Sequence, residues 1–280
     1  MNVPSRRPAL QCMMLTNPTE AATGRESEAA KRRLLSHRGE PLFIADWERV
    51  LMIHFEVAAG ALQGAVPFQL DLRDRRAFIS LVAFTMCGMR PRAGGRFLAW
   101  LFKPIATHHF LNVRTYVRHG GEAGIHFLAE WLSSRLAVRL GPATFGLPYR
   151  HGNIRYDHDW ENSQLRGRVA DARTGAALEY RAGSEFGTPM RFTPCEGGSL
   201  DEWLMERYTA FTCWRNRKRF FRIWHPPWPQ CPVKLNCRDD SLLKQNWPWF
   251  ADARTIGANF SPGVCEVWMG CPHFADSAAG

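Results

Sequence analysis

The chain has 280 residues, 45% of them hydrophobic, and its 36 basic and 26 acidic residues give a formal net charge of +10 at pH 7. This length can bury a sizeable core, as one large domain or two small ones. No run of 18 or more apolar residues occurs, so no segment is predicted to span a membrane and no membrane partner is expected. Eight irregularly spaced cysteines do not resemble the disulfide framework of a secreted protein, which predicts a cytoplasmic location.

The basic residues are almost all arginine. Only five are lysines: Lys31, Lys103, Lys218, Lys234 and Lys244. An arginine-rich, lysine-poor chain often reflects genome composition, so the charge alone does not favour a nucleic-acid partner. Residues 1–40 mix basic residues with Pro, Thr, Ser and Glu and predict a flexible basic arm. We predict a single domain over residues 41–274 and a C-terminal tail over residues 275–280.

The first half of the chain predicts four strands. These apolar segments, rich in β-branched and aromatic residues, are Arg49–Glu56, Ala77–Met89, Leu111–Arg118 and Gly124–Trp131. The Ala-rich segment Val57–Val66 predicts a short helix that ends near Pro67. Gly120-Gly121 joins the last two strands, which indicates a hairpin.

The second half predicts further strands and two short helices. Its strands are Ile154–Trp160, Gln164–Asp171, Ala176–Arg181, Thr209–Trp214, Arg219–Trp224 and Gly263–Met269. Ser133 or Ser134 caps a helix over Arg135–Leu140, which Gly141-Pro142 ends. A capping box at Ser199 and Glu202 begins a helix over Leu200–Arg207. Many short strands with a few helices predict a mainly β, antiparallel barrel or cone.

Three separated segments carry the most distinctive motifs. They are Asn112–Tyr156, which contains Gly-Leu-Pro at 146–148, then Ser199–Tyr208, and His225–Pro229. With these motifs in this order, the chain resembles the YqjF-like proteins, a bacterial family without an assigned function. That family is similar to the acetoacetate decarboxylases in fold. The resemblance implies a β-barrel or cone with a ligand pocket in its lumen.

The resemblance also places two substitutions in the decarboxylase machinery. Those enzymes use a lysine that forms a Schiff base with a keto substrate and a second lysine that lowers the pKa of the first. Aligned on Gly-Leu-Pro, the two positions fall on Tyr149 and Arg150, and neither side chain can form an iminium. The acidic pocket residue of the enzymes falls on Phe110 or Val113, depending on the register. Schiff-base decarboxylation is therefore not expected, and whether the protein is an enzyme stays open.

Polar residues alternate along the strand that begins near residue 112. Period-two alternation puts one row on a single face: Asn112, Arg114, Tyr116 and Arg118. Such a row inside a barrel is costly unless its groups pair with each other or with a ligand. We predict that Arg114 binds a carboxylate or enolate, and that Tyr116 or Tyr149 supplies a proton or hydrogen bond. The alternative is that Arg114 pairs with an internal acid, Glu130 or Glu206, and only stabilises the barrel.

Two histidines are further candidates for the site. His54 lies on the first strand, and His225 begins the Pro-rich segment. An isolated histidine is more often a hydrogen-bonded structural residue than a catalytic one. In the extended segment after His225, Trp228 is predicted to plug one end of the barrel.

Repeated cysteine spacings late in the chain raise the question of a metal site. The pairs Cys231/Cys237 and Cys265/Cys271 each have five intervening residues. Structural zinc sites usually have two to four, and this spacing spans roughly 20 Å on an extended strand. Scattered thiols are therefore the favoured interpretation, and no metal is predicted.

We predict a protein that binds a small organic acid or carbonyl compound in its lumen, with no cofactor. The candidate ligand-binding residues are His54, Asn112, Arg114, Tyr116, Tyr149, Arg150 and His225, with Arg114, Tyr116 and Tyr149 as catalytic candidates. One alternative is a non-catalytic interaction protein whose arginine-rich surface binds an acidic partner or nucleic acid, with a steep salt dependence. Another is a lyase that uses Lys103. The oligomeric state stays open.

Overall fold

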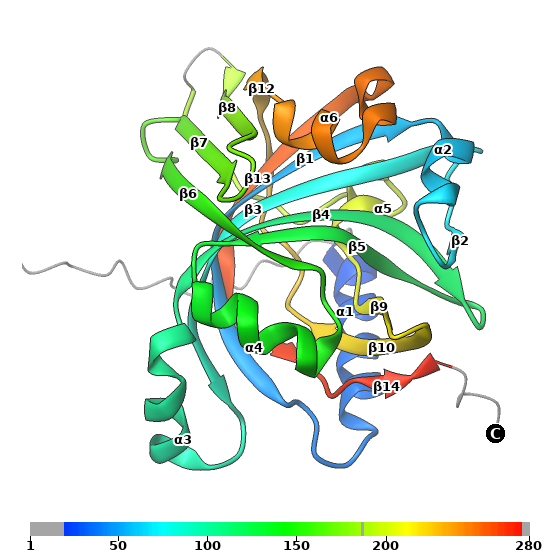
Figure 1. Ribbon diagram of the computed structural model, residues 1–280, viewed down its shortest axis with the longest axis vertical. Helices are drawn as coiled ribbons and strands as arrows, with labels where there is room; N and C mark the ends of the chain where they lie inside the picture. Colours follow the sequence, from blue (N-terminus) through cyan, green and yellow to red (C-terminus); the bar gives the residue numbers. More distant parts are fainter. Residues whose placement is uncertain (1–19, 186–187, 276–280) are drawn as a thin grey trace, which may run out of the picture.

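The structure, a computed structural model, describes residues 20–185 and 188–275 (Figure 1). Within these residues, fourteen strands form one branched sheet. The strands are β1 (Phe43–Val57), β2 (Gln69–Leu70), β3 (Ala77–Pro91), β4 (His108–His119), β5 (Glu122–Leu132), β6 (Tyr149–Asp159), β7 (Gln164–Asp171), β8 (Ala177–Gly183), β9 (Thr209–Trp214), β10 (Arg217–Trp224), β11 (Cys231–Pro232), β12 (Lys234–Asp239), β13 (Arg254–Met269) and β14 (His273–Phe274).

Short helices lie around this sheet. They are α1 (Glu20–Leu35), α2 (Ala59–Gly64), α3 (Gly95–Phe102), α4 (Arg135–Phe145), α5 (Leu200–Met205) and α6 (Ser241–Asn246), with 3₁₀ turns η1 (Lys103–Ile105) and η3 (Pro248–Asp252). The predicted mainly β architecture with a few short helices is confirmed. No helix in the described ranges has the length and apolarity needed to cross a membrane.

Seven of the strands close into a ring. From β5 the ring passes through β9, β10, β13, β1, β3 and β4, and β4 pairs with β5 again. The pairings are antiparallel except for the one between β5 and β9. The far end of β5 also pairs in parallel with β6, from which β7, β8 and β12 continue as a branch.

The ring and its branch enclose two hydrophobic cores. One core lies inside the ring, and the other lies between the ring and the branch, with α6 and η3 on it (Figure 1). On β4, Phe110 and Tyr116 belong to the inner core, whereas Leu111, Val113 and Val117 belong to the outer one. This is the period-two alternation that the sequence predicts for this strand.

β1 and β13 pass each other closely where the ring bends. Gly263 has φ +123°, and a Cβ there would lie 2.2 Å from the carbonyl oxygen of Trp47. A side chain would therefore push the two strands apart, so glycine is required at this crossing.

Three features of the helices differ from the sequence prediction. α4 does not end at Gly141-Pro142 but continues to Phe145, where Gly146 at φ +70° forms its left-handed C-cap. Pro142 stands eight residues into the helix, so its missing N–H leaves only one intrahelical bond unmade. α3 and α6 were not predicted, because both are short segments next to glycine- or proline-rich turns.

The third difference concerns the predicted basic arm. Residues 1–19 of that arm, like residues 276–280 of the tail, lie outside the described residues. Residues 20–35 form α1, which packs against β10 rather than extending into solvent as expected. Leu34 and Ala30 join Tyr208 and Trp224 in a small buried cluster. The Lys31 ammonium lies 4.4 Å from the centroid of a Trp224 ring.

This docking can be tested by two neighbouring leucines of α1. Leu34 is fully buried and Leu35 is exposed. We expect Leu34→Ala to lower the free energy of unfolding by about 3 kcal/mol, because it leaves a cavity against Trp224. Leu35→Ala should change it by less than about 0.5 kcal/mol. Urea unfolding of the full chain measures both, and equal small effects would mean that α1 does not pack on the ring.

Candidate functional site

A cavity of about 520 Å³ occupies one end of the ring interior. Strands of the ring, the start of β6, α3 and α4 form its walls, and most of its surface is apolar. Its apolar lining includes Phe43, Trp47, Phe84, Met86, Phe102, Phe110, Phe127, Leu132, Leu136, Leu140, Phe145, Leu147, Phe221, Ile223 and Met269. The volume is in the range of sites that bind small organic molecules.

Three polar side chains form a row across the wall of this cavity. Asn112 on β4 stands directly opposite Glu130 on β5, and Glu130 stands opposite Tyr149 on β6. All three residues line the cavity, together with His108. Residues directly opposite each other on paired strands have Cβ atoms about 5 Å apart. A small ligand group can therefore contact all three side chains at once.

Glu130 faces the cavity because β5 contains a bulge. The register with β4 shifts between Ala129, which pairs with Val113, and Phe127, which pairs with Arg114, so Leu128 is the extra residue. Leu128 and Ala129 both pack on the outer core, whereas Phe127 lies in the inner one. The bulge thus reverses the alternation and turns Glu130 inward.

Tyr149 is positioned by the helix before it. β6 begins at Tyr149, shortly after the C-cap Gly146 ends α4. A Cβ on Gly141 would lie 2.0 Å from a ring carbon of Tyr149, so only glycine lets the helix pack on this phenol. The Phe110 ring meets the Tyr149 ring edge-on, with centroids 6.2 Å apart.

The row is desolvated, and two of its buried oxygens lack a hydrogen-bond partner within the described protein. Burial raises the pKa of Glu130 well above its usual range, because desolvation favours the neutral acid over the carboxylate. Burial and the nearby Glu130 raise the pKa of Tyr149 as well. Glu130 Oε2, Asn112 Oδ1 and Trp47 Nε1 are buried without a hydrogen-bond partner in the described part of the chain. Burial lowers the pKa of His108 to about 4, so it is neutral too.

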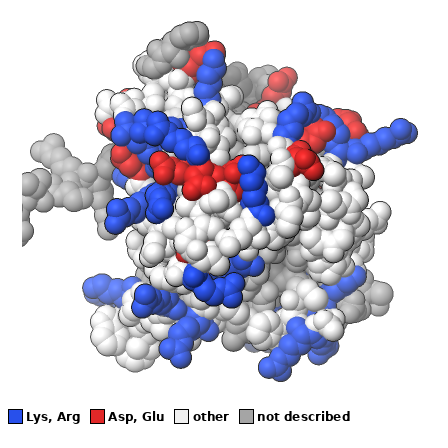
Figure 2. Space-filling view, turned by 45° about the horizontal axis from the view of Figure 1, so that its top comes forward, with Lys and Arg blue, Asp and Glu red and all other residues white. Residues whose placement is uncertain are grey.

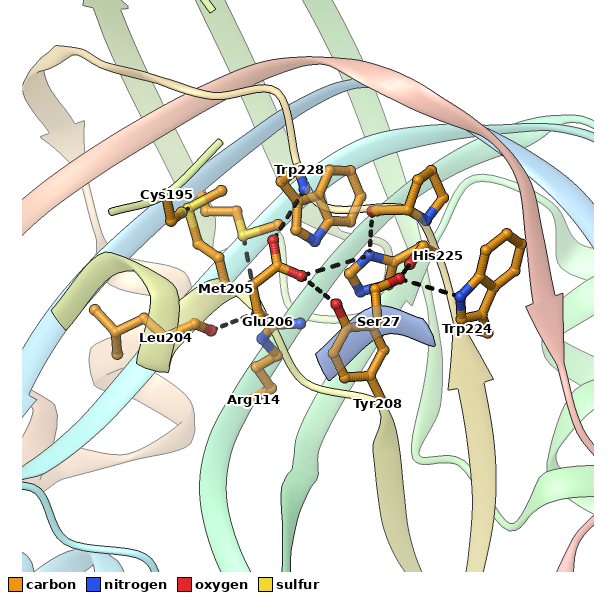
Figure 3. A network of polar contacts seen from close by, with 12 residues as sticks. Ser27, Arg114, Cys195, Leu204, Met205, Glu206, Tyr208, Trp224, His225 and Trp228 are labelled. Atoms are coloured by element: carbon orange, nitrogen blue, oxygen red, sulfur yellow. Dashed lines mark hydrogen bonds and ion pairs between the residues drawn. The ribbon is translucent and has the colours of Figure 1, made fainter. Parts of the chain in front are cut away.

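The structure places the other predicted β4 residues away from this cavity. The Arg114 guanidinium donates a 3.0 Å hydrogen bond from Nη2 to the carbonyl oxygen of Leu204 in α5 (Figure 3). Tyr116 donates a 2.9 Å hydrogen bond to the same oxygen, and its hydroxyl also contacts Ser80 Oγ. Neither Arg114 nor Tyr116 is among the cavity-lining residues. The two side chains fix α5 to β4.

The predicted pairing of Arg114 with an internal acid has no counterpart among the described ion pairs. Glu130 lies in the cavity row, and Glu206 contacts His225, with 3.9 Å between Glu206 Oε2 and His225 Nδ1. Arg114 Nη2 instead donates to the carbonyl oxygen of Leu204 and lies 3.7 Å from the sulfur of Met52. Arg114 thus holds the backbone of α5 in place and does not neutralise an acid.

The remaining candidates contact other protein groups, and two of them, His54 and His225, are buried. His54 Nδ1 lies 2.6 Å from Ser80 Oγ, and burial lowers its pKa to about 3. Arg150 lies on the opposite face of β6 from Tyr149, over the Trp131 ring, and bonds Asn246. His225 Nδ1 donates to the carbonyl oxygen of Pro226 at 2.8 Å.

His225 belongs to a network around Glu206 that fills the other end of the ring interior (Figure 3). Tyr208 donates a 2.6 Å hydrogen bond to Glu206 Oε2, and the backbone N–H of Trp228 donates a 2.9 Å bond to Oε1. Ser27 of α1 donates to the carbonyl oxygen of His225 at 2.7 Å. Trp228 is buried and stacks on Trp47, with centroids 6.1 Å apart. Trp228 thus fills the ring interior next to Trp47, which lines the cavity.

The late cysteines and Lys103 lie outside this site. In the described ranges, no three His, Cys, Asp or Glu side chains are grouped so that they could hold a metal ion. Lys103 is exposed at the start of η1 and is not a lining residue, although Phe102 and Pro104 are. The sequence missed Glu130 as a site residue. The sequence indicates Glu130 only as an acidic residue within an apolar strand. The bulge that turns it toward the cavity cannot be recognised from the residues around it.

The family of the chain follows from comparison with known sequences. A family model named DUF2071, described as an uncharacterized conserved protein, matches residues 44–264. The chain belongs to this family. The uncharacterized protein YqjF of Bacillus subtilis strain 168 is 31% identical over 189 residues, which cover 65% of this chain and 72% of YqjF. The resemblance based on three motifs is confirmed.

Solved structures show that this DUF2071 protein has an acetoacetate decarboxylase-like fold. Acetoacetate decarboxylase from Legionella pneumophila aligns with a TM-score of 0.56 at 12% identity, over 83% of this chain and 86% of that one. An acetoacetate decarboxylase-like enzyme from Sphingomonas wittichii RW1 aligns with 0.57 at 16%, over 83% and 92%. The enduracididine biosynthesis enzyme MppR, complexed with pyruvate, aligns with 0.58 at 11%, over 84% and 90%.

The buried carboxyl group of Glu206 should make the stability of the protein depend on pH. Burial raises its pKa from 4.5 to about 7. Its contribution to stability is therefore fully present below about pH 4.5 and is lost as pH rises through about 7. We expect Glu206→Gln to remove this loss, so that the variant gains up to roughly 3 kcal/mol relative to the wild type between about pH 4.5 and about pH 8.

Urea unfolding of both proteins over this pH range measures the difference. The buried histidines have lowered pKa values, so their contribution to stability increases as pH rises. They are common to both proteins, and their contribution cancels in the difference. The surface variant Glu161→Gln controls for the loss of a carboxyl group. A difference between Glu206→Gln and wild type that does not vary with pH would contradict the raised pKa of Glu206.

Proposed function

We propose that this protein binds a small, neutral carbonyl compound with an apolar body in the cavity beside Asn112, Glu130 and Tyr149. The observation that carries the proposal is the row of these three polar groups, set in an otherwise apolar wall. The apolar lining favours an aliphatic or aromatic body, and the row fixes one polar group of the ligand.

The row suits a carbonyl oxygen because it offers donors. A neutral Glu130 donates through its O–H, Tyr149 donates through its phenol, and Trp47 contributes an indole N–H. A ketone or ester oxygen accepts two such bonds, and this relieves the cost of leaving the donors desolvated. Asn112 presents an acceptor for a hydroxyl or amide N–H beside the carbonyl.

An ionised acid suits the cavity less well, which narrows the sequence-based hypothesis. No lysine or arginine occurs among the described residues that line the cavity, and His108 is neutral at pH 7. A buried carboxylate without a cation is costly. Arg114 and Arg150, the guanidinium groups that the sequence offered, bond to protein groups elsewhere.

The cysteines support a reducing compartment for this function. Cys87, Cys213, Cys231, Cys237 and Cys271 have free thiols. We therefore retain the cytoplasm as the expected location.

A matched set of ligands tests the proposal. We expect methyl nonyl ketone to bind the full-length protein at neutral pH, quenching tryptophan fluorescence through Trp47. Undecanoate and undecane should bind about ten-fold more weakly or not at all, because one is charged and the other lacks an acceptor. Equal affinity for the three ligands, or no binding of the ketone, would contradict the proposal.

Substitution of Glu130 tests the role of the row. Glu130→Leu should weaken ketone binding about ten-fold, the value of one hydrogen bond, whereas Glu130→Gln keeps a donor and should lose less. Glu130→Leu should also raise the free energy of unfolding by about 1 kcal/mol, because it removes a desolvated acid without a partner. Glu161→Gln on the surface is the control. A Glu130→Leu protein that is less stable would indicate a structural role for this acid.

A further inference from the structure

A patch of exposed apolar side chains surrounds the mouth of the cavity. We call it the α3–α4 surface, and it consists of Phe97, Trp100 and Leu101 on α3 and Leu136 and Leu140 on α4. Phe97 and Trp100 are 69% and 65% exposed, and the three leucines are 46–52% exposed. They make up five of the eight large apolar side chains that are exposed in the described residues. Isolated exposed leucines are common, but a cluster on two neighbouring helices indicates an interaction site.

Basic residues frame this surface and acidic residues are absent from it. Arg96, Lys103, Arg135 and Arg139 are exposed on or beside the two helices. The segments 90–107 and 133–150 contain no Asp or Glu. In Figure 2 the visible acidic side chains gather over the upper part of the face, and the lower part shows basic groups among uncharged residues. The surface is therefore apolar at its centre and cationic at its edge.

The same surface leads into the cavity. Leu101, Leu136 and Leu140 line the cavity and are also exposed to solvent. The gap between α3 and α4 is therefore where the cavity reaches the outside. An apolar ligand that enters here would pass directly over the exposed side chains.

We propose that the α3–α4 surface docks on an anionic lipid bilayer, with the cavity mouth facing the lipid. The tryptophan, phenylalanine and leucines would insert at the level of the headgroups, while the basic rim contacts anionic lipid phosphates. The helices lie on the bilayer in this arrangement and do not cross it. The sequence predicted no membrane partner because no run of 18 or more apolar residues occurs, and the exposure of the α3 side chains is visible only in the fold.

Two other occupants fit the surface less well. A second copy of the chain would bring the basic rims together, and the two segments hold no acidic residue to pair with them. A nucleic acid would match the charge, and Phe97 and Trp100 offer it stacking faces. The three exposed leucines, however, offer it neither a stacking face nor a hydrogen bond. An anionic bilayer satisfies both the apolar centre and the cationic rim. The docking does not depend on which ligand the cavity binds.

Flotation of the full-length protein with vesicles tests this surface. We expect binding to vesicles of phosphatidylcholine mixed with phosphatidylglycerol and at least about ten-fold weaker binding to phosphatidylcholine alone. The double variant Phe97→Ser/Trp100→Ser should lose at least about ten-fold in binding to the anionic vesicles. Leu72→Ser, another exposed leucine outside the surface, should bind like the wild type.

The rim is tested by charge removal at matched positions. Arg135→Gln/Arg139→Gln should weaken vesicle binding about ten-fold, whereas Arg166→Gln/Arg181→Gln, exposed on the branch, should not. Equal effects of the two pairs would overturn the proposal, because they would indicate net charge and not this surface. Tighter binding of an oligonucleotide than of vesicles, or a dimer that Phe97→Ser/Trp100→Ser dissociates, would also overturn it.

Discussion

The bulge in β5 is the constraint on which the rest of the structure depends. β5 pairs with β4 and β9 to close the ring, and its far end pairs with β6 to begin the branch. One extra residue, Leu128, lies between the part of β5 that pairs with β9 and the part that pairs with β6. It reverses which face of the strand points into the ring. Trp131 can therefore pack in the outer core while the neighbouring Glu130 faces the cavity. Without this residue the acid would enter the outer core instead.

The two ends of the ring interior are polar in different ways. At the closed end, Arg114 and Tyr116 bond the Leu204 carbonyl, and Glu206 accepts bonds from Tyr208 and Trp228. At the open end, Glu130 Oε2 and Asn112 Oδ1 have no partner within the described protein. Buried polar atoms without a partner occur at both ends, because Arg114 Nε and Trp228 Nε1 are also unsatisfied in the described residues. Glu130 and Asn112 line the cavity, where a ligand can complete them, whereas Arg114 and Trp228 do not. This difference is why we place the binding site at the cavity and not around Arg114.

Much of the fold could be predicted from the sequence, because period-two patterning and turn residues act locally. β7 and β9 occur with the predicted bounds, and Ser134 caps α4 as one of the two predicted serines. The site was predicted only in part. Asn112 and Tyr149 line the cavity, but the importance of Glu130 depends on a bulge and on pairing with β6, a strand of distant sequence. Likewise, α1 contains few large apolar residues, and its docking depends on packing against Trp224 and Tyr208, which are distant in the sequence.

The two positions that the resemblance assigns to the decarboxylase lysines have different surroundings because of the geometry of β6. Tyr149 and Arg150 are consecutive on β6, so their side chains point to opposite faces. Only Tyr149 can serve the cavity, and Arg150 instead covers Trp131 and bonds Asn246. The arginine at position 150 therefore does not place a positive charge inside the lumen. Tyr149 stays in the cavity wall beside Glu130 and Asn112, and this row is the basis of the proposed carbonyl ligand.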